Sequence, residues 1–144
     1  MSNVKCSKGF TLIELLLYVA IVGAIVFSFA GFLSLLMASR VKNQTIAEVE
    51  QQGIQVMQLI TQTGRNATDI NFTSAFDLSG GTIRQNSIAL TNSRIVASNL
   101  TFTNLSRAGT HGTIRIQFAL THINPSGRNE YDYNKTFYGT ASLR

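Results

Sequence analysis

The sequence predicts an α+β fold in which one long N-terminal helix, over residues 10–63, packs on a small C-terminal antiparallel β-sheet. Three observations support this prediction. Residues 15–39 contain no charged side chain. An apolar stripe with helical spacing continues to residue 60. Beyond residue 64, apolar residues recur at every second position. The chain of 144 residues therefore divides into a hydrophobic stem and a small polar head.

The stem begins with an apolar run of about 25 residues, which as a helix is long enough to cross a hydrocarbon core of roughly 30 Å. Past residue 40 the apolar residues keep to one helix face, and glutamines occupy the others. Gly64 can end the helix in a left-handed C-terminal cap. The whole helix, of about 54 residues, would then be roughly 80 Å long.

The head carries several short candidates for antiparallel strands. Ser79-Gly80-Gly81 and Asn92-Ser93 are turn signals between them. The clearest strand covers residues 113–121, where apolar and polar side chains alternate. Asn124-Pro125-Ser126-Gly127 predicts a turn, after which residues 136–143 return as an antiparallel partner. The other strand candidates are residues 82–84, 87–90 and 94–105.

Glu14 stands at the start of the apolar run. Because a carboxylate inside a membrane-spanning helix costs about 2.5–3.5 kcal/mol, a plain anchor leaves it unexplained. A secretory signal, with Lys5 and Lys8 as its basic region, leaves it unexplained too. Cleavage between Gly9 and Phe10 would place a new α-amine four residues before Glu14, on the same helix face. The helix dipole also favours a negative charge there.

The segment Lys8-Gly9-Phe10-Thr11-Leu12-Ile13-Glu14-Leu15-Leu16 resembles the prepilin leader motif of type IV pilins and type II secretion pseudopilins. The resemblance implies that a prepilin peptidase cleaves after Gly9 and N-methylates Phe10. It also implies that Glu14 helps to recruit and register subunits in a growing filament. Glycine suits the position before the scissile bond, because without a Cβ it allows a protease to approach the backbone closely. The resemblance covers the first third of the chain.

This resemblance implies a leader peptide at residues 1–9, a transmembrane or filament-core helix at 10–39, an amphipathic extension at 40–64 and a β-rich globular head at 65–144. The protein would cross the inner membrane once, with an extracytoplasmic head, and later enter a pilus or pseudopilus. Its partners would be prepilin peptidase, other pilin or pseudopilin subunits, an inner-membrane assembly platform and membrane lipid. Basic residues on the two sides of the stem nearly balance, so the orientation rests on the resemblance.

Two features of the head favour a minor subunit over a major pilin. The tail, residues 129–144, resembles the termini of minor pilins and pseudopilins. The head also lacks the paired cysteines with which many major pilins close their last loop, and the lone Cys6 excludes an intramolecular disulfide. The alternative is a binding module, an adhesin or DNA-uptake pilin, presented by the membrane or the filament.

The sequence shows no catalytic constellation, so we expect neither an enzyme nor a cofactor. His111 and His122 have no ligand-spaced neighbours, and we expect no metal site. Residues 129–132 offer oxygen atoms to calcium, but without the EF-hand spacing. DNA binding is disfavoured because the arginines of the head form no basic cluster with interleaved aromatic residues.

Overall fold

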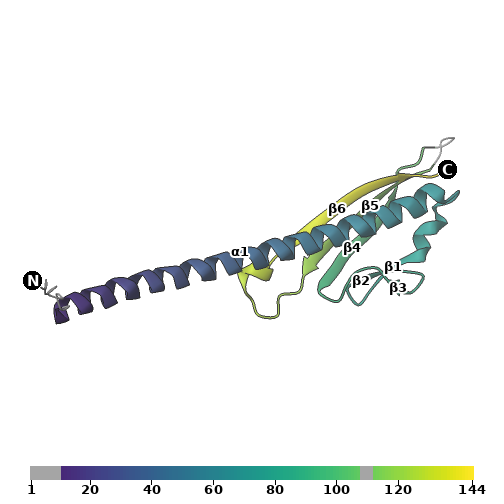
Figure 1. Cartoon of the computed structure of the whole chain (residues 1–144). Coiled ribbons are helices and arrows are strands. Elements are labelled where there is room, and N and C mark those ends of the chain that lie inside the picture. Colours follow the sequence, from purple (N-terminus) through teal and green to yellow (C-terminus); the bar gives the residue numbers. More distant parts are fainter. Residues whose placement is uncertain (1–10, 108–111) are drawn as a thin grey trace, which may run out of the picture. The chain divides into compact units, whose positions relative to one another are not determined.

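The computed structural model describes residues 11–107 and 112–144 of the chain. These residues form a long α-helix, α1 (Leu12–Asn66), two antiparallel sheets and two short 3-10 helices, η1 (Ile70–Ala75) and η2 (Asn129–Tyr131) (Figure 1). A long N-terminal helix packed on a C-terminal antiparallel sheet is the α+β fold that the sequence predicts, and that prediction is confirmed.

The chain separates into two compact units, Met1–Ser39 and Arg40–Arg144. In the first unit, every side chain from residue 11 to residue 37 is exposed. The mean hydropathy of α1 reaches 2.5 over an 18-residue stretch. Of the described residues, only this helix is long and apolar enough to cross a membrane. An apolar surface of this extent requires lipid or apolar partners to cover it.

In the second unit, one face of α1 is buried against the sheets. Its buried residues are three or four positions apart, as expected for one helix face. They are Thr45, Val49, Gly53, Val56, Ile60 and Gly64. The helix therefore contributes a continuous stripe to the head's hydrophobic core, as the apolar pattern of the sequence predicts.

The end of α1 differs from the prediction. The helix continues to Asn66, and Gly64 lies inside it instead of forming a left-handed cap. A Cβ on Gly64 would lie 2.9 Å from the Cβ of Ala141 and 2.9 Å from Cζ of Phe72. Glycine is therefore needed here for close packing between the helix and its neighbours, a requirement that local sequence does not reveal.

The larger sheet has the strand order β4 (Ile95–Asn104), β5 (Thr113–His122) and β6 (Asn134–Ser142), with antiparallel neighbours (Figure 1). The predicted strands at 94–105, 113–121 and 136–143 are thus confirmed. Phe118 and Phe137 face each other in register, with ring centroids 5.4 Å apart. The side chains of β5 that alternate into the core are fully buried: Ile114, Ile116, Phe118 and Leu120.

The smaller sheet is a meander of β1 (Phe76–Ser79), β2 (Thr82–Gln85) and β3 (Ile88–Ala89). Two-residue turns join its strands. Gly80 and Gly81 form the first, and Asn86 and Ser87 the second; all four residues have positive φ, as type I′ hairpins require. The sequence did not predict β1, because its four residues offer too short an alternation to stand out.

Glu50 joins α1 to the last strand. Its Oε1 accepts hydrogen bonds from Lys135 Nζ at 2.5 Å and from Tyr133 Oη at 3.1 Å. The bond from Lys135, followed by that from Tyr133, lowers the pKa of the Glu50 carboxyl below its ordinary value of 4.5. The same contact with Glu50 raises the pKa of Lys135 above its ordinary value of 10.5.

Glu50 should therefore make part of the head's stability depend on acid pH. A carboxyl group whose pKa is lowered by folding stabilises the fold above its unfolded pKa, and this stabilisation is lost as the pH falls through the folded value. We expect the wild-type head to lose stability as the pH falls below 4.5. Glu50→Gln and Lys135→Gln should both reduce that loss. Urea unfolding of the full chain in detergent, followed by circular dichroism at a series of pH values, measures it; unchanged pH dependence in both variants would contradict the assignment.

A second prediction concerns Gly53, which faces Phe137 of β6. A Cβ on Gly53 would overlap the Phe137 ring. Gly53→Ala gains at most about 1 kcal/mol of helix propensity, whereas overpacking a core costs about 1–3 kcal/mol. We expect net destabilisation of the head in thermal unfolding. Gly31→Ala is the matched control, because nothing lies within 4 Å of its added Cβ. A Gly53→Ala head as stable as wild type would contradict this packing.

Candidate functional site

The structure describes one of the site residues that the sequence predicts, Glu14. It occupies the first turn of α1 with an exposed side chain. Its backbone N–H donates to Thr11 Oγ1 at 3.4 Å and to the Thr11 carbonyl at 3.1 Å. The other predicted site residues, Lys5, Lys8, Gly9 and Phe10, lie outside the described ranges, as does His111.

Thr11 and Glu14 begin the helix as a capping pair. The pattern Thr-x-x-Glu is that of a capping box, in which the threonine hydroxyl accepts the N–H of the third helical residue. The structure shows this bond from Glu14 to Thr11. A glutamate at that position lies in the first turn, where the helix dipole favours its negative charge. The capping bond thus fixes where the helix starts and places Glu14 in its first turn.

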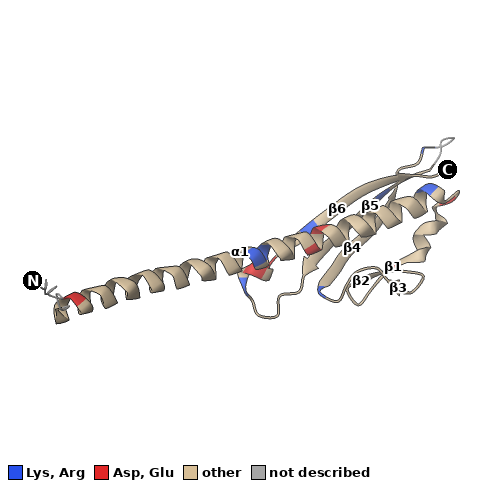
Figure 2. Ribbon diagram, in the orientation of Figure 1, with Lys and Arg blue, Asp and Glu red and all other residues tan. Residues whose placement is uncertain are grey.

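The Glu14 carboxylate has no hydrogen-bond or ionic partner among residues 11–107 and 112–144. It is followed by a helical stretch without charged residues as far as Arg40, which Figure 2 shows as a tan length of ribbon. In an apolar environment such a carboxylate requires a cation or a hydrogen-bond donor. The start of α1 can therefore bind a cationic group at one defined position.

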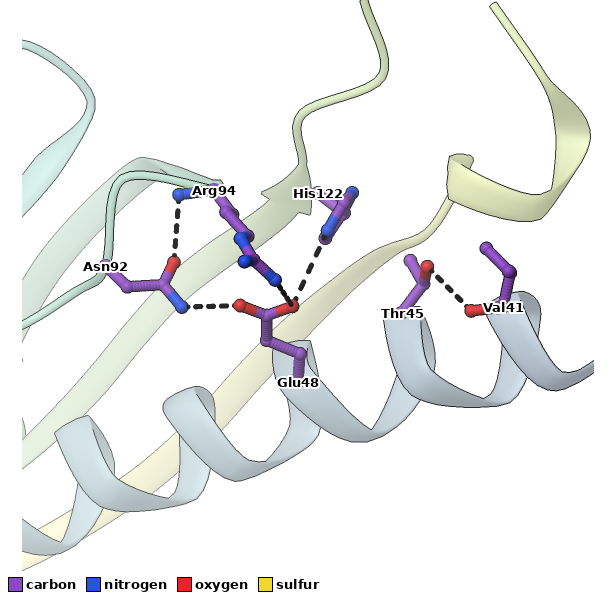
Figure 3. Close-up of polar contacts among 6 residues, drawn as sticks. All are labelled: Val41, Thr45, Glu48, Asn92, Arg94 and His122. Carbon is purple, nitrogen blue, oxygen red and sulfur yellow. Dashed lines mark hydrogen bonds and ion pairs between the residues drawn. The ribbon is translucent and has the colours of Figure 1, made fainter. Parts of the chain in front are cut away.

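The head contains a second polar group of residues, which we call the Glu48 cluster: Glu48, Asn92, Arg94 and His122 (Figure 3). Glu48 Oε1 accepts a hydrogen bond of 2.6 Å from Asn92 Nδ2. Glu48 Oε2 lies 3.7 Å from Arg94 Nη1 and 3.7 Å from His122 Nε2. One carboxylate on α1 thus faces groups from the loop before β4 and from the end of β5.

Backbone contacts hold the members of this cluster in place. The Asn92 Oδ1 accepts the N–H of Arg94 at 3.0 Å, which tightens the turn leading into β4. The Arg94 carbonyl accepts the N–H of Ile123 at 2.8 Å and so joins this turn to the end of β5. The sequence did not predict the cluster, because its members are far apart along the chain. Only one feature of the sequence points toward this cluster. The alternation of β5 places His122 on the same side of the strand as the buried Leu120.

Lys42 lies where the sequence offered oxygen atoms to calcium. Its Nζ donates to the carbonyl oxygens of Asn129 at 2.9 Å and Asp132 at 2.6 Å. Glu130 of the same loop pairs with Arg128 at 3.0 Å. Across the described part of the chain, no three His, Cys, Asp or Glu side chains come together to hold a metal ion. The carbonyls of this loop therefore hold an ammonium group that the chain itself supplies.

Comparison with known proteins gives one match. Residues 4–29 match the family model described as the prokaryotic N-terminal methylation motif. No curated protein and no solved structure matches the chain. The matched segment contains Glu14 and its capping residue Thr11, and it extends into the exposed apolar part of α1. The chain therefore carries the N-terminal methylation motif that the sequence analysis associates with type IV pilins and type II secretion pseudopilins, at the start of a long helix that packs on an antiparallel sheet.

Proposed function

We propose that the chain is a structural subunit, a minor pilin or pseudopilin, of a type IV pilus or type II secretion-like filament. The observation that carries this proposal is the methylation motif at residues 4–29, which coincides with the start of an exposed apolar helix. Prepilin peptidase would cleave between Gly9 and Phe10, remove Lys5 and Lys8 with the leader, and methylate Phe10. The tail at residues 129–144 and the lack of paired cysteines support the minor role.

Cleavage would supply a cation for Glu14, whose carboxylate has no partner among the described residues. The new α-amine on Phe10 would lie four residues before Glu14, within reach of its carboxylate on the same helix face. In lipid this amine, from the same chain or from a neighbouring subunit, is the least costly partner for the charge. Because each subunit then carries one amine and one carboxylate at its helix start, pairing between subunits defines their axial register.

The exposed apolar surface of α1 suits two successive environments. Before assembly, lipid would cover residues 11–37, with the head on the extracytoplasmic side of the inner membrane. During assembly an inner-membrane platform would transfer the subunit into the filament, where neighbouring helices replace the lipid. Both environments bury the same apolar face, so the transfer requires no change in the helix itself. A structural role of this kind uses no catalytic residue.

The second candidate is a binding module that the membrane or filament presents, as an adhesin or DNA-uptake pilin. The Glu48 cluster favours it, because polar groups gathered beside a hollow in the head are typical of ligand sites. The two functions are compatible in one subunit. They separate experimentally: loss of binding with intact assembly supports the module, and loss of assembly alone supports the structural role.

Glu14→Ala should separate processing from assembly. We expect the variant to be cleaved and membrane-bound, because the cleavage segment and the apolar helix are unchanged. We expect its incorporation into filaments to fall at least about tenfold, as removal of a charge pair worth about 1.4 kcal/mol or more would give. Immunoblots of sheared filaments and membranes measure the two fractions. Wild-type incorporation would rule out the role of Glu14.

The Gly9→Val variant tests the cleavage site. A branched side chain at this position should obstruct the peptidase, so the precursor should accumulate uncleaved. Mass spectrometry of the wild-type N-terminus provides the positive measurement, with methylated Phe10 as the expected first residue. Cleavage of Gly9→Val at the wild-type rate would contradict the site. A mature N-terminus at Gly31 would instead indicate an ordinary signal peptidase acting after the Ser28-Phe29-Ala30 sequence.

A further inference from the structure

Two hollows adjoin the Glu48 cluster, with volumes of about 350 and 300 Å³. Arg94, His122 and Tyr131 line both and form the wall between them. The larger hollow is completed by the loop that follows β5, including Ile123 and Pro125. Its volume lies at the lower end of the range typical of small-ligand sites.

Hydrogen-bonding capacity at this wall is only partly used. Arg94 is 74% exposed, and its guanidinium contacts Glu48 at 3.7 Å, longer than an N–H···O hydrogen bond. A guanidinium carries five N–H donors, so most of those on Arg94 remain available on the side away from Glu48. His122 is 9% exposed, and its buried Nδ1 has no hydrogen-bond partner among the described residues. The exposed donors of Arg94 are therefore the groups at this wall that a ligand in the hollow can reach.

The rest of the larger hollow is mainly apolar, with Ser93 and Ser126 as its other polar members. The Tyr131 ring is stacked on the His122 ring, with centroids 5.8 Å apart and planes 16° from parallel. Ile123 leaves 41% of its surface exposed, and Pro125 lies beside it in the lining. A ligand that fits this hollow therefore combines an apolar body with a group that accepts hydrogen bonds from Arg94.

We propose that this hollow binds a carboxylate carried next to an aromatic or branched apolar group. The apolar part rests on Ile123, Pro125 and Tyr131, and the carboxylate meets the outer edge of the Arg94 guanidinium, whose planar fork matches two carboxylate oxygens. A phosphate suits the position less well. Glu48 already places one negative charge 3.7 Å from Arg94, and a dianion would experience about twice the repulsion of a monoanion.

The test uses the full processed chain in detergent micelles, with ¹³C-labelled isoleucine methyl groups observed by NMR. The probe is 3-phenylpropionate, and its uncharged amide is the matched control. We expect a saturable shift of the Ile123 methyl signal, with the acid binding at least about tenfold more tightly than the amide, as a charge-assisted hydrogen bond gives. Absence of a saturable shift, or equal binding of acid and amide, would overturn the proposal.

Arg94→Gln should remove the preference for the acid, and Arg65→Gln, which changes an exposed arginine at the end of α1, should leave it intact. Unchanged signals of the buried Ile114 and Ile116 report that each variant is folded. Should Arg94→Gln not fold, Arg94→Lys keeps the charge without the fork and is expected to weaken the preference. Wild-type discrimination in a folded Arg94 variant would refute the assignment.

N-acetyl-L-phenylalanine distinguishes the two sources of such a carboxylate. It reproduces the carboxyl terminus of a peptide, whereas 3-phenylpropionate reproduces a free organic acid. Tighter binding of the first supports a protein terminus as the ligand, and tighter binding of the second supports a small acid. Either result supports the chemistry proposed for the hollow. Failure of both leaves the filament role intact, because that role rests on residues at the start of α1.

Discussion

The close approach of α1 to strand β6 is the contact on which the head depends. At Gly53 the helix surface lacks a side chain, and the Phe137 ring of β6 occupies that space. At Gly139 the strand lacks one, and Met57 of the helix packs there. Two glycines on opposite partners thus bring helix and sheet together more closely than larger residues permit. This packing places Glu50 opposite Lys135 and surrounds Phe118 with aromatic and aliphatic neighbours.

The same helix serves two different physical environments in its two parts. Residues 15–39 carry no charge, and the side chains of residues 15–37 are exposed, whereas the part from residue 40 onward has buried positions on one face and polar positions on the others. The hydrophobic effect therefore drives the first part toward lipid or toward other helices, and the second part toward its own sheets. One continuous helix can therefore present an apolar surface in its first part and pack on the sheets in its second part, because both sets of contacts fit the same helical geometry.

Features with a local cause could be predicted from the sequence. The long helix follows from its apolar run and stripe, and strand β5 from alternating residues such as Ile114 and Ile116. Features set by distant partners could not. Gly64 has the local signature of a cap, yet contact with Phe72 and Ala141 keeps it helical. Glu14 was identified from the energetic cost of an isolated charge, and the Glu48 cluster was missed because only folding brings its members together.

Lys42 gives the loop before β6 a property that a bound metal ion would not. Its ammonium satisfies the carbonyls of Asn129 and Asp132 while remaining covalently attached to α1. The local concentration of this cation is therefore fixed by the fold and does not vary with the mineral content of the surroundings. Chelating agents and dilution, which loosen metal-bound loops, have nothing to remove from these two carbonyls. Where divalent ions fluctuate, the loop therefore keeps its geometry at constant occupancy.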